Sequence, residues 1–96
     1  MLTKIQQSAT RRQQTVKTHL DPLIADLADE IRDADPEAKQ TLHGARKTLT
    51  ETAREVSAAN VRDSAAAMRQ VKALWPNSHA YDGAVEYLDS LTRMAA

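Results

Sequence analysis

The first third of the chain carries ten apolar positions, alanine included, that fall on one side of a single long helix. At about 100° per residue these positions lie within about 50° of a common direction: Leu2, Ile5, Ala9, Val16, Leu20, Leu23, Ile24, Leu27, Ile31 and Ala34. Pro22 falls on the opposite side, so the stripe keeps its phase across the proline. We therefore predict one helix over residues 3–34, kinked at Pro22. The alternative is a separate arm over residues 3–20, followed by a helix that Asp21 caps.

The residues that follow indicate where the second helix begins. Asp35 suits an N-cap, Pro36 suits the first helical position, and Glu37 places an acid in the first turn. Because the connection is so short, the second helix must run antiparallel to the first. We predict it over residues 36–58, with a buried stripe formed by Ala38, Leu42, Ala45, Leu49, Ala53 and Val56.

The phase of the apolar positions breaks after Ser57. The next set is rotated by more than about 90°, so one straight helix cannot bury both sets; it comprises Val61, Ala65, Met68, Val71 and Trp75. We predict a turn over residues 58–62, with Asn60 as its left-handed residue or as an N-cap. A third helix then covers residues 62–75 and ends before Pro76. A fourth helix covers residues 79–95.

These elements predict an all-α fold: a small four-helix bundle with a long, Pro-kinked first helix and an antiparallel hairpin between helices one and two. Residues 1–96 form a single helical domain, from which residues 1–20 extend or swap as a helical arm. Trp75 and Tyr81 are expected in the core and Tyr87 at its edge. Large apolar residues are few and Phe is absent, so self-association could supplement this core.

Charge changes sign along the chain, although the net charge is zero. Residues 1–20 carry four basic side chains and no acid, whereas residues 21–37 carry seven acids. In the predicted hairpin we expect exposed ion pairs, worth roughly 0–1 kcal/mol each, between Lys39 and Arg46 on one helix and Asp26, Glu30 and Asp33 on the other. The basic charge of residues 1–20 has no such partner within the chain.

This unmatched segment is the predicted interaction site. Its partner-binding residues are Ile5, Ala9, Arg11, Arg12 and Val16. In a homodimer, the first helix could pair antiparallel with its two-fold mate, so that each basic half meets the other's acidic half. An acidic surface on another protein would serve equally. We predict a non-enzymatic protein–protein interaction module, a small regulator, inhibitor or adaptor that acts as a homodimer.

The alternative function is a DNA-binding regulator with a degenerate helix-turn-helix. Asn60 and Val61 would form its turn. The residues that would contact nucleic acid are Arg62, Ser64, Arg69, Gln70 and Lys72. Ala59 and Ala66 stand where the motif needs bulky apolar residues, so protein interaction is favoured.

The sequence contains no catalytic or metal-binding motif. Cysteine is absent, and the three histidines lie on three different predicted helices. Without a Gly-rich loop or an acid inside an apolar stripe, we predict no enzyme activity, no cofactor and no metal. No segment has the length and apolarity of a membrane span, and residues 1–5 lack the apolar core of a signal peptide. We therefore expect a cytoplasmic protein without a membrane partner.

Overall fold

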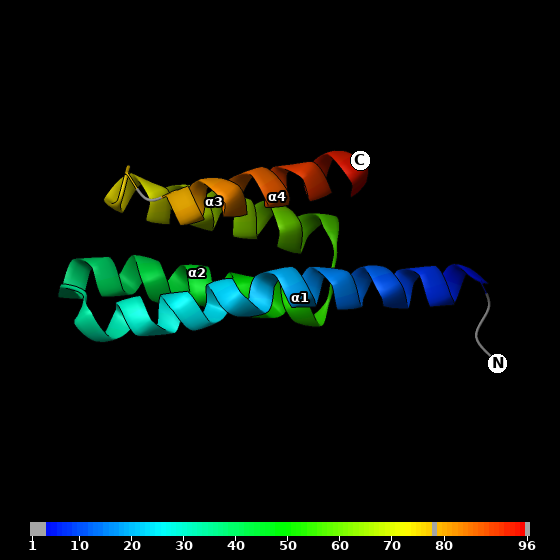
Figure 1. Ribbon diagram of the computed structural model, residues 1–96, viewed down its shortest axis with the longest axis horizontal. Helices are drawn as coiled ribbons and strands as arrows, with labels where there is room; N and C mark the ends of the chain where they lie inside the picture. The colour runs from blue at the N-terminus through cyan, green and yellow to red at the C-terminus, as the bar shows by residue number, and fades with distance from the viewer. Residues whose placement is uncertain (1–3, 78, 96) are drawn as a thin grey trace.

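The computed structural model describes the backbone of residues 4–77 and 79–95, and the side chains of residues 11–77 and 81–93. Four α-helices account for nearly all of these residues: α1 (Lys4–Asp33), α2 (Pro36–Arg54), α3 (Ala58–Leu74) and α4 (His79–Ala95). Successive helices run antiparallel, and Figure 1 shows the α1–α2 hairpin beside the α3–α4 hairpin. The predicted all-α bundle is confirmed. None of the described helices is both long enough and apolar enough to cross a lipid bilayer.

Helix α1 continues through Pro22, as the phase of its apolar stripe predicts. Pro22 is exposed, while Leu20 and Leu27 on either side of it are fully buried. A proline has no backbone N–H, so one carbonyl in the preceding turn loses its hydrogen bond. On the solvent side of the helix water can bond that carbonyl, which limits the loss of stability. The alternative of a separate arm over residues 3–20 is therefore wrong.

The α1–α2 turn forms at Asp35 and Pro36, as predicted. Asp35 has the extended backbone of an N-cap, with φ −64° and ψ 156°, and Pro36 opens the helix. The backbone N–H of Lys39 donates to the Asp35 carbonyl over 2.8 Å, which closes the first turn of α2. The Asp35 side chain makes no capping hydrogen bond, so the backbone conformation and the proline set this start.

The α2–α3 turn lies earlier than predicted and uses different residues. Helix α2 ends at Arg54 instead of residue 58, and α3 begins at Ala58 instead of residue 62. Ser57 is the N-cap, and its Oγ accepts a hydrogen bond from the Asn60 N–H at 3.1 Å. Asn60 lies inside the first turn of α3, and its side-chain Nδ2 donates to the Glu55 carbonyl at 2.9 Å.

The expected left-handed residue is absent, because no non-glycine residue in the described part of the chain has a positive φ. The change of phase in the apolar pattern is accommodated by the three residues 55–57, of which Glu55 and Ser57 are extended. Two N-cap-type residues, Ser57 and Asn60, compete in this stretch, and the earlier one forms the cap.

The α3–α4 connection agrees with the prediction to within a residue. Helix α3 ends at Leu74, with Trp75 as its C-cap, and Pro76 follows. Helix α4 has the predicted bounds. The Tyr81 side chain is buried and its ring centroid lies 6.3 Å from that of Trp75, which is itself only partly buried. The two aromatic rings thus close one end of the core.

A single hydrophobic cluster joins all four helices. Its largest fully buried apolar side chains are Val16, Leu20, Leu27, Leu42, Leu49, Met68, Val71 and Leu88. Two hydroxyl side chains are also fully buried where α2 crosses α3: Thr52 Oγ1 lies 2.7 Å from Ser64 Oγ and 2.9 Å from the carbonyls of Thr48 and Asn60. Because these polar groups bond one another, their burial costs little.

Candidate interaction surfaces

The first turns of α1 project beyond the rest of the bundle (Figure 1). With 30 residues, α1 is roughly 45 Å long, whereas α2 with 19 residues is about 28 Å long and α3 and α4 about 25 Å each. The longest dimension of the molecule, 49 Å, accordingly reflects α1. The start of α1 therefore has no neighbouring helix in this chain alongside it.

Gln13 marks where α1 joins the bundle. Its Oε1 accepts a hydrogen bond from the Val56 N–H at 2.9 Å, and its Nε2 donates to the Ala53 carbonyl. Both backbone groups belong to the end of α2 and the turn that follows it, where helix ends leave carbonyls and amides without partners. One side chain of α1 thus satisfies two backbone groups of the α2–α3 connection. No sequence pattern singled out Gln13.

Val16 is a correction to the predicted partner-binding set. Its side chain is 1% exposed and belongs to the core cluster, so it packs inside the molecule instead of lying on an exposed surface. The projecting segment is shorter than residues 1–20, because the bundle reaches back along α1 as far as Gln13.

The remaining predicted partner-binding residues lie on the projecting segment or next to it. Arg11 and Arg12 are exposed and form no ion pair within the described residues. Ile5 and Ala9 belong to α1, but they lie outside the part of the chain whose side chains are described. Only the two arginines can therefore be placed on the surface.

The expected ion pairs across the α1–α2 hairpin do not form. Among the described residues, neither Lys39 nor Arg46 contacts a carboxylate of α1, and the α1 pairs that do form are local. Lys17 Nζ lies 2.9 Å from Asp21 Oδ2, and Arg32 pairs with Asp29. The positions of charged residues along the sequence therefore did not predict which ion pairs form.

Two acids of α1 act electrostatically on α4. Burial raises the pKa of the Tyr81 hydroxyl, and the charges of Glu30 and Asp26 raise it further. We name the exposed residues Asp26, Asp29, Glu30 and Asp33 the acidic flank of α1.

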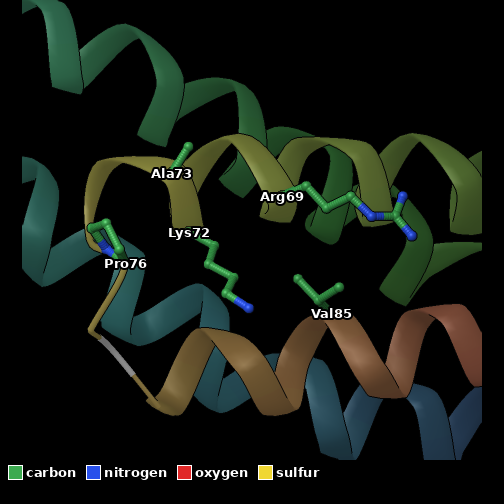
Figure 2. A pocket seen from close by; sticks show the side chains of 5 residues that line it. All are labelled: Arg69, Lys72, Ala73, Pro76 and Val85. Atoms are coloured by element: carbon green, nitrogen blue, oxygen red, sulfur yellow. The ribbon is translucent and has the colours of Figure 1, made fainter.

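The α3–α4 hairpin, in contrast, does pair its charges between helices. Arg69 pairs with Asp89 and Lys72 pairs with Asp82. Both basic residues line an open groove of about 410 Å³ whose other walls are Ala73, Pro76 and Val85. Figure 2 shows Lys72 and Val85 directed into the space between the two helices.

The residues predicted for the alternative DNA site do not form one surface. Ser64 is fully buried, so it is not available to a ligand. Arg69 and Lys72 are paired with aspartates of α4, while Arg62 and Gln70 are exposed. Val61, which was to follow the turn residue, is buried inside α3. The helix-turn-helix geometry is therefore wrong for this chain.

A surface with several basic residues lies on the outer side of α2, and the sequence predicted internal pairing only for its Arg46. An open hollow of about 570 Å³ is lined by His43, Arg46, Lys47, Thr50, Glu51 and Arg54. Its residues recur every three or four positions, which is the spacing of one side of a helix. The available signal was the run of residues 38–50, which contains Lys39, Arg46 and Lys47 and no acid.

The described side chains contain no group of three His, Cys, Asp or Glu residues arranged to hold a metal ion. Comparisons with protein-family models, with curated proteins and with solved structures gave no match for this chain. Any functional argument must accordingly come from the surfaces themselves.

Proposed function

We propose that this chain is a non-enzymatic protein–protein interaction module that forms a homodimer through α1. The observation that carries the proposal is the projection of the first turns of α1 past the other three helices (Figure 1). A helix segment this short is marginal in water without packing against a partner. The sequence places Ile5 and Ala9 of this segment on the same stripe that is buried from Val16 onward.

Charge complementarity supports a second copy of α1 as the occupant. Arg11 and Asp29 are both exposed and are equally distant along the helix from Leu20. About five whole turns separate them, so they point in the same direction, away from the buried side of Leu20. If two α1 helices lie antiparallel with the two-fold axis beside Leu20, Arg11 of each copy meets Asp29 of the other. The neighbouring side of α1 is covered by α4, where the ring centroids of His19 and Tyr87 lie 4.4 Å apart.

The Arg11–Asp29 contact must replace one that exists within the chain. Asp29 already pairs with Arg32 within α1, but that contact is highly exposed and is easily exchanged. The Arg11–Asp29 pair therefore supports the axis beside Leu20.

The dimer is expected to be weak and sensitive to salt. Exposed ion pairs contribute roughly 0–1 kcal/mol each and are screened at physiological ionic strength. Such affinity suits a small regulator, inhibitor or adaptor that exchanges partners. The cytoplasm is the proposed compartment, and a chain without cysteine has no disulfide to maintain there.

A charge-swap experiment on the full-length chain tests the proposal by sedimentation equilibrium at low salt. We expect the wild-type chain to dimerise, and both the double variant Arg11→Glu/Arg12→Glu and the double variant Asp26→Arg/Asp29→Arg to be monomeric, because like charges then meet across the axis. The variant that combines all four substitutions should dimerise again. A deletion of residues 1–17 is less informative, since it also removes Gln13 and Val16 from the bundle.

Two outcomes would contradict the proposal. One is a wild-type chain that remains monomeric at its highest soluble concentration in low salt. The other is a dimer that persists unchanged in both double variants, which would show that α1 is not the interface.

A further inference from the structure

The basic surface of α2 carries a second inference, independent of the dimer. His43, Arg46, Lys47 and Arg54 are all exposed on one side of this helix, around the open hollow of about 570 Å³. From His43 to Arg54 the helix rises about 16 Å. That length corresponds to roughly five phosphates of one DNA strand at about 3.4 Å each along the duplex axis.

The cations of this surface are not neutralised within the chain. None of Arg46, Lys47 and Arg54 forms an ion pair in the described part of the structure. Glu51 lines the hollow together with the three cations, and Glu55 lines an adjoining hollow with Arg54, so the cations still outnumber the acids. No carboxylate of the acidic flank is paired with these cations. The surface of α2 is thus free to attract an anion.

The composition of this surface favours nucleic acid over a protein partner. The residues that line the hollow are three cations, a histidine, a threonine and a glutamate, so the apolar part of its surface comes from the stems of polar side chains. Protein–protein interfaces centre on buried apolar and aromatic anchors, whereas interfaces with nucleic acid are polar and strongly positive. Two arginines can bind phosphate oxygens with two hydrogen bonds each, and a lysine contributes a point charge.

We propose that the outer side of α2 binds the phosphate backbone of duplex DNA without reading its sequence. Arg46, Lys47 and Arg54 contact phosphates, while the side chain of His43 extends the polar surface by one turn. The contact is made by the side of a helix, and it needs neither a helix-turn-helix nor the residues of α3. The proposal also does not depend on dimerisation through α1.

The test measures the binding of a labelled, random-sequence 20-base-pair duplex by fluorescence anisotropy. With three phosphate contacts, affinity should fall about 40-fold between 50 and 200 mM salt. The double variant Arg46→Gln/Lys47→Gln loses two contacts, each worth about tenfold at 50 mM salt, so we expect affinity to fall about 100-fold and the salt dependence to flatten. These residues are exposed, and circular dichroism should confirm that the variant remains folded.

The matched control is Arg62→Gln/Arg93→Gln, which removes the same charge from exposed positions on α3 and α4. We expect this variant to bind the duplex almost as tightly as the wild-type chain. It leaves Arg11 and Arg12 in place, so its result does not depend on the α1 dimer.

Several results would overturn the proposal. They are no binding at 50 mM salt, full binding by Arg46→Gln/Lys47→Gln, or an equal loss in the Arg62→Gln/Arg93→Gln control. The same assay also measures the binding of poly-glutamate, which stands for an acidic protein partner. If it binds through Arg46 and Lys47 at least as tightly as the duplex does, the surface recognises an acidic protein and the assignment to DNA is wrong.

Discussion

The two helical hairpins of this molecule use their charges in opposite ways. In the α3–α4 hairpin, Arg69 and Lys72 reach across to aspartates of the other helix. In the α1–α2 hairpin, the recorded ion pairs stay within α1, and the basic residues of α2 have none in the described part of the chain. Charge in one hairpin therefore ties two helices together, while charge in the other remains available to partners.

Helix rotation explains this difference. Each helix is rotated so that its apolar stripe packs in the shared core. This rotation also sets the direction in which its charged side chains point. On α3 and α4 the resulting sides oppose each other. On α1, Asp26 and Glu30 act on Tyr81 of α4, whereas Arg46 and its neighbours line an open hollow on α2. Opposite charges on adjacent helices thus remain apart.

The largest expected effect tests whether the two hairpins share one core at all. Leu42 of α2 and Leu88 of α4 are both fully buried in the common cluster. We expect Leu42→Ala and Leu88→Ala each to lower the free energy of unfolding by about 2–5 kcal/mol. Urea denaturation followed by circular dichroism and by Trp75 fluorescence should give coincident single transitions. Separate transitions would mean that the α1–α2 and α3–α4 hairpins unfold independently and do not share one core.

An intermediate effect is expected at the contact between α2 and α3, which joins the two hairpins. Thr52→Val leaves the buried Ser64 hydroxyl without its recorded partner, so we expect a loss of about 1–3 kcal/mol. Ser64→Ala should cost less, because Thr52 Oγ1 still has the Thr48 and Asn60 carbonyls within 2.9 Å. The loss in the double variant should be smaller than the sum of the single losses in a double-mutant cycle. Additive losses would show that the two hydroxyl groups are not coupled.

The smallest effect tests the comparison of charges directly. Asp82→Asn and Asp89→Asn each break a pair across α3 and α4, and we expect each to cost roughly 0–1 kcal/mol, less at high salt. Asp26→Asn and Asp33→Asn are matched controls on the acidic flank. They should leave stability unchanged or slightly raised, since they reduce repulsion among neighbouring acids. The measurement is urea denaturation at two salt concentrations. If the α4 variants and the α1 variants lose equal unfolding free energy, the two hairpins do not differ in how they use their charges.

Most of the fold could be predicted from the sequence because its signals are local. The proline at residue 36 and the proline at residue 76 mark helix boundaries through their own backbone geometry. The continuous stripe across Pro22 correctly indicated an unbroken α1. The α2–α3 turn was misplaced, since Ser57 and Asn60 are both suitable caps and local preference did not choose between them.

The candidate surfaces could be predicted only in part. The sequence identified Arg11 and Arg12 as basic residues without an internal partner, and both are exposed. It wrongly placed Val16 with them, because an apolar stripe does not show how far along it the neighbouring helices extend. The role of Gln13 depends on where the chain leaves α2, forty residues later, and no local pattern encodes that distance.

By itself, the sequence determined the number of helices, their approximate bounds and the apolar side that each one buries. These features follow from backbone preferences and periodicity within a few turns of chain. Only the tertiary structure decided how far the bundle covers α1, which hydroxyl groups meet between α2 and α3, and which charges pair. Those outcomes depend on the rotation and offset of whole helices against one another, which are fixed by packing of the shared core.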